Sequence, residues 1–383
     1  MTMKKFCLLL FVFSFSFWIK PSLLQAKSNY IFRTFSPEGG FYYDGVKDII
    51  QDKEGFIWVL MDENLYRFDG YEYKSYYSHF TAFDKSIRWT INNHAIDSRG
   101  QLYINTSNGL FRYDRRYDTF EILARLDASI IKIDAHDNIW TFANKTWSIL
   151  NLETRQLSAP PSDKDSILTL RSFFDDYQGD AYVLSTASKL FRYDSSTQKL
   201  NFCFPLPADC YPNYIALHRG KLWALSDKSG IFKIDLATST VEDHMNLPAQ
   251  WTSKALYIDK YGLIWIGTID GLYIIDPATK QVTHYTHSAT DSYSLPNNSI
   301  WCIKEDNQQN VWIGTFSGGL AYVNLDEKLS FQSYFPSAKG LNHAPVSGFA
   351  EDKKYLWIST EGGGLNRMDK VTGEFAHYTH HPQ

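Results

Sequence analysis

The chain has 383 residues, with 38 Lys and Arg against 42 Asp and Glu, and a formal net charge of −4. A mildly acidic chain without a cluster of basic residues is not expected to bind nucleic acid or an anionic lipid surface. Aromatic residues make up 16% of the chain. No stretch beyond the N-terminus keeps a 3.6-residue apolar period, and the composition therefore predicts an all-β protein.

The first 26 residues have the features of a secretory signal peptide. Lys4 and Lys5 precede an uncharged apolar run over residues 6–19, and Ala26 ends a short cleavage motif. The run is shorter than the length of about 20 residues that a transmembrane helix needs. We therefore expect cleavage after Ala26, a periplasmic location and no membrane contact by the mature chain, with an uncleaved N-terminal anchor as the alternative. Cleavage removes three lysines and no acidic residue, which moves the formal net charge to −7.

One sequence unit recurs along the whole chain. Residues 262–276 read GLIWIGTIDGLYIID, in which a Trp within a β-branched run is followed by a Gly-containing turn and a second apolar run. This pattern is typical of a tight β-hairpin. The same register occurs eight times, 37 to 47 residues apart, and its anchor residues are Trp58, Tyr103, Trp140, Tyr182, Trp223, Trp265, Trp312 and Trp357.

An acidic residue stands six positions before most anchors. The members of this column are Asp52, Asp97, Asp134, Asp176, Asp259, Asp306 and Glu351, and Leu217 is the exception. In several copies a glycine follows three residues later, which makes a D-x-x-G turn between two apolar runs. Repeated carboxylates could serve acid–base chemistry, as in glycosidases. The turn context favours the interpretation that they cap turns, and we predict no catalytic residue among them.

Each copy has room for four short antiparallel strands, which is the pattern of a β-propeller blade. In chain order the copies begin near residues 46, 91, 128, 170, 211, 253, 300 and 346. Tyr30 to Phe35 forms an additional outer strand that can close the ring. We expect a propeller over residues 27–336 and an eighth repeat over 337–383, which is either the closing blade or the start of a truncated second propeller. The ring thus has seven or eight blades. The chain stops where a linker to a ninth copy would start, and we interpret it as the front part of a longer ancestral protein.

All eight copies resemble a known repeat family, strongly in the first, second, sixth, seventh and eighth copies and weakly in the third, fourth and fifth. The segments IWIGTIDGLYIIDP (264–277), VWIGTFSGGLAYVN (311–324) and LWISTEGGGLNRMD (356–369), with the linker SLPNNSI (294–300), are similar to the two-component regulator propeller repeat. The resemblance implies the periplasmic sensor region of a Bacteroidetes hybrid two-component system, in which two seven-bladed propellers and an Ig-like domain precede a histidine kinase. The ligands of that family are commonly glycans. This sequence has no Ig-like segment, membrane helix or kinase region, so we do not extend the kinase activity to it.

Candidate ligand-binding residues lie in the loops that lead into the inner strands. Aromatic faces beside amide and guanidinium donors suit sugar rings. The candidates are Arg88, Trp89, Trp251, Asn297 and Asn298. Packing of the two tryptophans between blade and loop is the alternative.

Other residue types give no site. The histidines His284, His287, His377, His380 and His381 lack a convincing metal-ligand spacing. No cofactor motif is present. Cys203 and Cys210 can form a disulfide or remain thiols, and Cys302 makes the mature count odd.

The sequence therefore predicts a secreted, non-catalytic sensor propeller. Its expected partners are an oligosaccharide and downstream sensor modules or a dimer partner. The alternatives are a propeller lyase or glycosidase acting on polysaccharide and a protein-interaction scaffold. An enzyme would need polar groups converging on the central channel, and the inner-strand positions that we assigned to it are apolar: Ile49, Ile131, Phe173, Leu256 and Ile303.

Overall fold

The structure is a computed structural model. It describes residues 30–35, 45–78, 90–126, 128, 130–134, 137–143, 146–152, 154–158, 170–175, 181–185, 187–194, 197, 199–248, 251–327, 334, 336–337 and 340–379. The predicted signal peptide lies outside this part of the chain.

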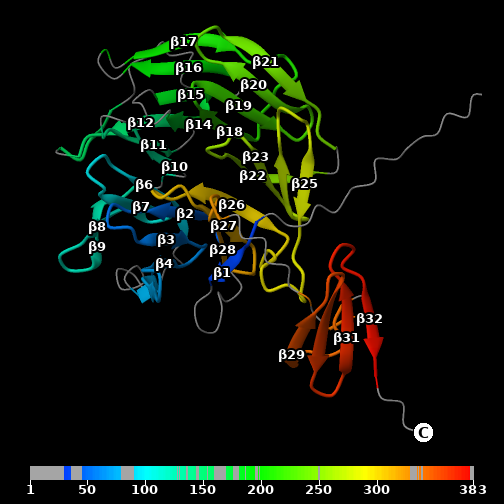
Figure 1. The fold of residues 1–383 in the computed structure, drawn as a ribbon. Helices are drawn as coiled ribbons and strands as arrows, with labels where there is room; N and C mark the ends of the chain where they lie inside the picture. Colours follow the sequence, from blue (N-terminus) through cyan, green and yellow to red (C-terminus); the bar gives the residue numbers. More distant parts are fainter. Residues whose placement is uncertain are drawn as a thin grey trace, which may run out of the picture.

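The described strands form eight four-stranded antiparallel sheets, as the repeat predicted (Figure 1). The first three sheets contain β2 (Asp48–Gln51), β3 (Ile57–Leu60), β4 (Leu65–Phe68) and β5 (Tyr73–Ser75); β6 (Ile91–Ile96), β7 (Leu102–Thr106), β8 (Gly109–Asp114) and β9 (Thr119–Ala124); and β10 (Ile130–Ile133), β11 (Ile139–Ala143), β12 (Thr146–Leu150) and β13 (Leu157–Ser158). The next three contain β14 (Leu170–Asp175), β15 (Ala181–Ser185), β16 (Lys189–Asp194) and β17 (Lys199–Pro205); β18 (Tyr214–His218), β19 (Lys221–Ser226), β20 (Gly230–Asp235) and β21 (Thr240–Met245); and β22 (Ser253–Ile258), β23 (Ile264–Thr268), β24 (Leu272–Ile275) and β25 (Val282–Tyr285).

The seventh sheet takes its fourth strand from the other end of the chain. It contains β26 (Ile300–Glu305), β27 (Val311–Thr315), β28 (Leu320–Val323) and β1 (Arg33–Phe35), and Arg33 of β1 pairs with Tyr322 of β28. The predicted N-terminal outer strand is therefore present, and it completes the seventh copy. The eighth sheet, β29 (Val346–Glu351), β30 (Tyr355–Thr360), β31 (Gly364–Asp369) and β32 (Phe375–Tyr378), has its own outer strand.

Seven hydrophobic clusters join the first seven sheets into a closed ring. Each cluster combines buried residues of two successive sheets, and one of them joins the seventh sheet to the first through Trp312, Leu320, Val46 and Val59. The anchor residue of each blade packs against the blade that follows it, as Trp58 does against β6–β9. The core is therefore radial, and the beginning and end of the ring are held by the same packing as its other blades.

Two glycines show how closely the blades approach. A Cβ atom on Gly314 would lie 2.6 Å from a methyl carbon of Val46 in the first blade, and one on Gly267 would lie 2.6 Å from a methyl carbon of Ile300 in the seventh. Any larger residue at these two positions would push neighbouring blades apart.

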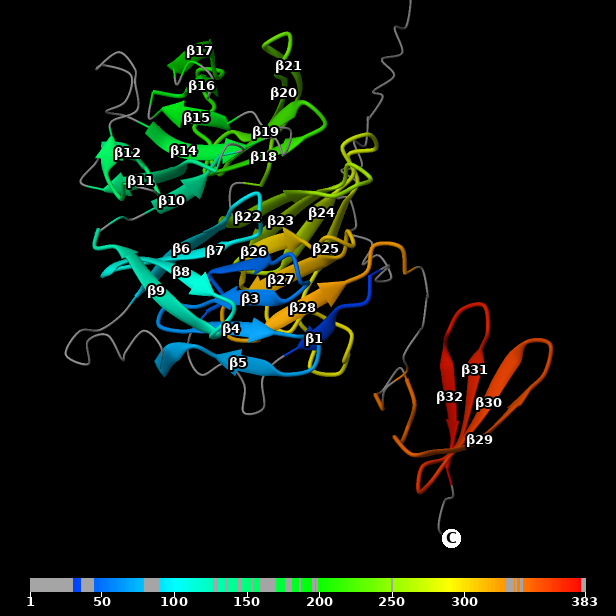
Figure 2. The same ribbon diagram turned by 90° about the vertical axis from the view of Figure 1, so that its left-hand side faces the viewer.

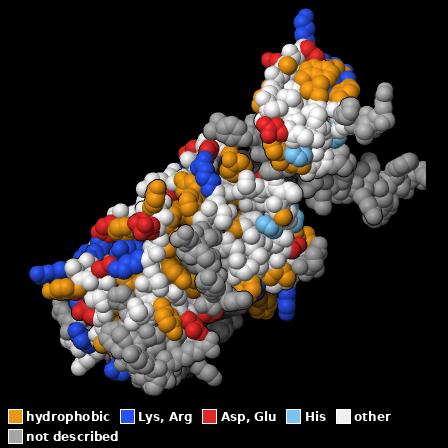
Figure 3. Space-filling model, turned by 90° about the horizontal axis from the view of Figure 1, so that it is seen from below, with side chains coloured by type: hydrophobic (Ala, Val, Ile, Leu, Met, Phe, Trp, Pro, Cys, Tyr) orange, Lys and Arg blue, Asp and Glu red, His pale blue; other side chains and the backbone are white. Residues whose placement is uncertain are grey.

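The eighth sheet stands apart from the ring in both ribbon views (Figures 1 and 2). None of the seven clusters of described residues contains a residue of β29–β32. Hydrophobic side chains gather on the surface of this separate lobe (Figure 3). Phe349 is 71% exposed and Val371 is 90% exposed.

Candidate functional site

The acidic column forms a structural bond that the sequence did not reveal. In the first blade, Asp52 Oδ1 accepts hydrogen bonds from the backbone N–H groups of Glu54 and Phe56, and its Oδ2 accepts one from Trp58 Nε1 at 2.8 Å. The same indole-to-carboxylate bond, at 2.9 to 3.0 Å, joins Trp140 to Asp134, Trp265 to Asp259, Trp312 to Asp306 and Trp357 to Asp352. Both carboxylate oxygens have structural partners, which confirms turn capping.

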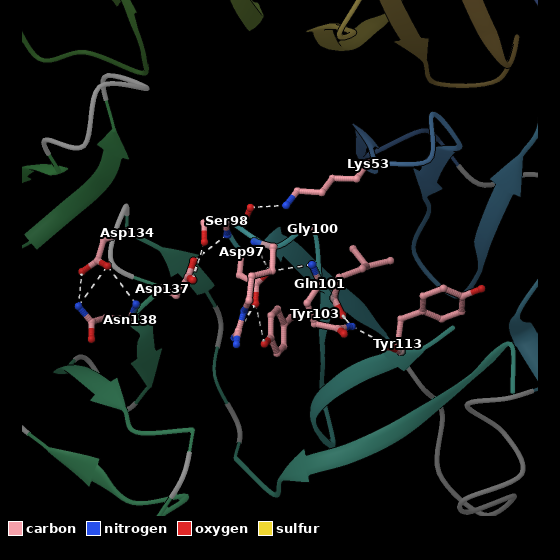
Figure 4. Close-up of polar contacts among 12 residues, drawn as sticks. Lys53, Asp97, Ser98, Gly100, Gln101, Tyr103, Tyr113, Asp134, Asp137 and Asn138 are labelled. Atoms are coloured by element: carbon pink, nitrogen blue, oxygen red, sulfur yellow. Dashed lines mark hydrogen bonds and ion pairs between the residues drawn. The ribbon is translucent and has the colours of Figure 1, made fainter. Parts of the chain in front are cut away.

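Figure 4 shows this turn in the second and third blades, together with the contacts that link one blade's turn to the next. Tyr103 takes the place of the tryptophan, and its hydroxyl donates to Asp97 at 3.3 Å. Lys53 of the first blade donates to the Ser98 carbonyl, and Ser98 in turn donates to Asp137 of the third blade through its N–H and its hydroxyl, each at 2.7 Å. In three blades, the turns between the first and second strands are thus connected to one another. We call the face of the ring that carries these turns the turn face.

One member of the column needs correction, and the exception at Leu217 has a structural explanation. In the eighth copy the assignment of Glu351 is wrong, because a one-residue deletion makes Asp352 the residue that binds Trp357. In the fifth copy, Leu217 precedes a two-residue hairpin in which Arg219 and Gly220 have φ angles of 50° and 72°. Positive φ at both positions is typical of a type I′ turn, which needs no aspartate cap. Trp223 Nε1 is accordingly buried with no hydrogen-bond partner among the described residues.

The predicted ligand-binding residues do not form one cluster in the described part of the chain. Arg88 and Trp89 lie outside the described residues. Trp251 is 8% exposed and stacks on Tyr273 with ring centroids 3.8 Å apart. Asn297 donates to Ser317 in the turn between β27 and β28 and accepts from the N–H of Ser299 in its own loop. Asn298 accepts from the N–H of His287 at 2.6 Å. These contacts hold loops in place, and among the described residues no hydrogen bond or ring contact joins Trp251 to Asn297 or Asn298.

Each described histidine of the HYTH segments forms a hydrogen bond between a ring nitrogen and a backbone carbonyl. The carbonyl partners of His284, His287 and His377 are those of Asp270, Leu295 and Gly340. Among the described residues, no group of three His, Cys, Asp or Glu side chains is placed to hold a metal. Cys203 and Cys210 are not joined by a disulfide, and Cys302 is likewise a thiol.

Ionisable side chains from the inner strands of three other blades surround the Asp48 carboxylate of the first blade. Lys304 Nζ lies 3.2 Å from Asp48 Oδ1, and His94 Nδ1 lies 3.7 Å from Oδ2. Lys132 also stabilises the charged form of Asp48. Because the third blade is not adjacent to the first, this influence acts across the central channel.

The charge state of this channel cluster follows from burial and from the two lysines. Burial lowers the pKa of His94 to about 4, against the opposing effect of Asp48. Burial alone would raise the pKa of Asp48, but Lys304, His94 and Lys132 hold it below its usual value. Near neutral pH the cluster therefore has a carboxylate beside a neutral imidazole.

The inner-strand positions that we assigned to the channel lie on the opposite face of these strands. Ile49, Ile131 and Ile303 are at most 5% exposed and belong to the clusters between blades. The channel residues Asp48, Lys132 and Lys304 are their immediate neighbours, which point the other way because side chains alternate along a strand. The alternation was visible in the sequence and would have identified them.

A pocket of about 380 Å³ opens at the seam between the first and seventh blades. It is lined by Phe35, Gln51, Gly55, Ile57, Phe68, Asp69, Gly70, Asp306, Gln308, Asn310, Trp312 and Tyr322. This seam pocket combines aromatic rings from both blades with amide side chains, a composition that suits a sugar ring. The N-terminal strand β1 contributes Phe35, so the pocket exists only in the closed ring.

Among the described residues, no helix has the length and hydropathy needed to span a bilayer.

Comparison with known proteins gives a family model and several relatives. A model described as a two component regulator propeller matches residues 294–317. Histidine kinase P4 of Formosa agariphila is 42% identical over 65 residues, which are 17% of this chain and 5% of the kinase. The match confirms the resemblance to this repeat.

Two solved structures from B. thetaiotaomicron share the fold. The extracellular domain of the putative one component system BT4673 has a TM-score of 0.63 and 23% identity, over 92% of this chain and 54% of that domain. The extracellular domain of the putative hybrid two component system BT3049 has a TM-score of 0.65 and 22% identity, over 91% of this chain and 49% of that domain. The β-propeller fold is confirmed, and the chain spans about half the length of these domains.

Proposed function

We propose that this chain, a β-propeller with two component regulator propeller repeats, is the ligand-sensing part of a periplasmic sensor and binds an oligosaccharide without transforming it. The observation that carries the proposal is the seam pocket, where aromatic and amide groups of the first and last blades of the ring line one cavity. Its volume lies within the usual range for small-molecule sites, about 300–1,000 Å³.

The position of the pocket supports a sensing role. Phe35 of β1 packs against Phe68 of the first blade at 5.3 Å and against Trp312 of the seventh at 5.8 Å, measured between ring centroids. A sugar bound beside these rings contacts both sides of the closure. Binding therefore stabilises the closed ring relative to an opened one by the usual linkage between ligand and conformation.

The test uses the purified chain and a panel of oligosaccharides, with thermal melting and product analysis in parallel. We expect one class of oligosaccharide to raise the melting temperature without release of product. Gln308→Trp fills the pocket and should abolish the shift. Gln281→Trp is the matched control, because Gln281 is an exposed glutamine in a turn of the sixth blade and does not line the pocket.

Three results would contradict this proposal in different ways. Release of shortened or unsaturated product would support the enzyme alternative, for which the channel cluster around Asp48 is the place to look. An equal shift in Gln308→Trp and Gln281→Trp would place the ligand elsewhere. No shift with any member of the panel would favour a scaffold for protein contacts.

We also propose that residues 337–383 begin a second propeller. The support is the open face of the eighth sheet, since anchors in the ring pack against the following blade and Trp357 has no such blade among the described residues. Hydrogen exchange provides the test. Amides of β29–β32 should exchange much faster than those of β22–β25, and equal protection of the two sheets would contradict an unpartnered blade.

A further inference from the structure

A second cavity lies on the turn face, beside the second blade. Its volume is about 330 Å³, and its lining is Arg99, Gly100, Gln101, Tyr103, Arg112 and Arg115. Figure 4 shows the local frame, with Gly100, Gln101 and Tyr103 around the turn between β6 and β7. We call this cavity the arginine pocket. Three guanidinium groups line it and no carboxylate does, in a chain whose net charge is −4.

Carboxylates outside the lining hold each guanidinium group. Arg99 Nη2 lies 3.2 Å from Asp97 Oδ2. Arg112 pairs with Glu121 on the adjacent strand β9, and Arg115 pairs with Glu54 of the first blade. Arg115 also donates to the Gly100 carbonyl at 2.7 Å. These contacts fix the arginine side chains in position before any ligand arrives.

The three arginines retain hydrogen-bonding capacity toward the cavity. A guanidinium group has five N–H donors in a planar fork. Each of the three arginines pairs with its carboxylate through one nitrogen. Their side chains are 71%, 45% and 35% exposed for Arg99, Arg112 and Arg115. Three arginines that line one cavity and have N–H donors left over from their ion pairs are suited to an oxyanion, which several donors can bind at once.

The arginine pocket and the seam pocket flank one turn. Gln51 and Gly55 of the first blade line the seam pocket, on the side of the seventh blade. Lys53 and Glu54, between them in the sequence, bind Ser98 and Arg115 of the second blade. One extended ligand on the turn face can therefore reach both cavities by crossing the turn of the first blade.

We propose that the arginine pocket binds the carboxylate or sulfate group of the ligand, so that the sensed oligosaccharide is an acidic one. The identity of the ligand as a sugar rests on the proposed function, whereas binding of the anionic group rests on the three arginines alone. The pocket thereby selects among sugars by charge, and the seam pocket contacts a neutral ring of the same ligand.

The experiment is isothermal titration calorimetry of the whole chain with sodium sulfate, sodium glucuronate and glucose, with ionic strength held constant by sodium chloride. We expect the two anions to bind and glucose to give no heat. Arg112→Gln should weaken anion binding at least tenfold, and Arg99→Gln is a second variant that leaves Arg112 and its partner intact. Arg116→Gln is the matched control, because Arg116 is an exposed neighbour outside the lining and should bind as the unsubstituted chain does.

The outcomes separate this proposal from the proposed function. Gln308→Trp should leave the sulfate and glucuronate titrations unchanged, because it blocks only the seam pocket. The comparison of the two anions tells which group the pocket prefers. Equal anion binding by Arg112→Gln, Arg99→Gln and Arg116→Gln, or heats no larger for the anions than for glucose, would overturn the proposal even if a neutral oligosaccharide binds at the seam.

Discussion

The sixth and eighth sheets have closely similar sequences in very different surroundings. Trp265 is fully buried, whereas its counterpart Trp357 is half-buried, and Leu272 is 0% exposed against 37% for Leu365. Both sheets nevertheless have the same strand order, and both anchors donate to an aspartate. The repeat therefore encodes the sheet and its turn locally, and its burial depends on the presence of a neighbouring blade.

A single position illustrates the difference. Gly267 in the sixth sheet and Gly314 in the seventh lie where a neighbouring blade leaves no room for a Cβ atom. The corresponding residue of the eighth sheet is Ser359, which has room for its hydroxyl and bonds Ser347 at 3.0 Å. The eighth sheet thus accepts a side chain at a position where the sixth and seventh sheets have no room for one.

The largest expected effect comes from opening the ring. Deletion of residues 27–35 removes β1 and with it Phe32, which is 1% exposed and packs on Tyr285 at 5.3 Å. Loss of Phe32 alone corresponds to about 3–5 kcal/mol of unfolding free energy, and the lost strand pairing adds to it. Urea denaturation should show a strongly destabilised ring, and a change below about 1 kcal/mol would contradict closure by β1.

The next largest effect is the difference in ring stability between substitutions of Trp265 and of Trp357. Trp265→Ala should lower the free energy of unfolding of the ring by about 3–5 kcal/mol, because it leaves a cavity between two blades. Trp357→Ala should leave the ring transition unchanged, because Trp357 lies outside the ring. Parallel urea melts of the two variants test this difference, and similar shifts of the ring transition would show that the eighth sheet is packed against the ring.

Substitution of the aspartate bonded to each anchor should likewise destabilise the ring in the sixth sheet and leave it unchanged in the eighth. Asp259 is fully buried and accepts three hydrogen bonds, so that Asp259→Asn leaves a buried donor facing an amide at a cost of about 1–3 kcal/mol. Urea melts of Asp259→Asn and Asp352→Asn compare the two sites. A ring transition lowered equally by Asp352→Asn would be inconsistent with an independent eighth sheet.

Acid should affect the eighth sheet through Asp352. The hydrogen bond from Trp357, followed by backbone N–H groups, lowers the pKa of Asp352 to about 2. A depressed pKa in the folded state stabilises the sheet above the ordinary carboxyl pKa of about 3.9, and this contribution is lost as the pH falls toward 2. The indole N–H resonance of Trp357 should shift over this range and should not move in Asp352→Asn. A titration of that resonance centred near pH 4 would refute the assignment.

The smallest effect is expected from removing the eighth sheet altogether. A chain that ends at residue 336 should keep the melting temperature of the ring, since none of the seven described core clusters includes β29–β32. Differential scanning calorimetry of the two chains makes the comparison. A fall of several degrees on truncation would show that the sheet supports the ring.

Much of the fold could be predicted because each blade is a local unit. The anchors all lie on the second strand of their sheets, and the strand before the first copy was expected to close the ring. The choice between seven and eight blades required the partner of β1, which is a long-range pairing that periodicity within a copy does not encode. The sequence therefore left both closures open.

The candidate site was less accessible from the sequence. The seam pocket takes residues from β1, the first blade and the seventh blade, and the arginine pocket depends on a contact between Arg115 and Glu54 of a neighbouring blade. Residues brought together only by ring closure leave no spacing signal. By contrast, Trp251 was a candidate because it lies in a loop that leads into an inner strand, and its stacking on Tyr273 explains its presence without a ligand.

The pairing of Arg33 with Tyr322 also sets the order of events during synthesis. The first strand of the described residues has its partner in the last copy of the ring, so it stays unpaired until that copy has formed. Closure is therefore a late step with a large loop-closure entropy, and it is the stage at which an exposed strand edge is most open to pairing with another molecule.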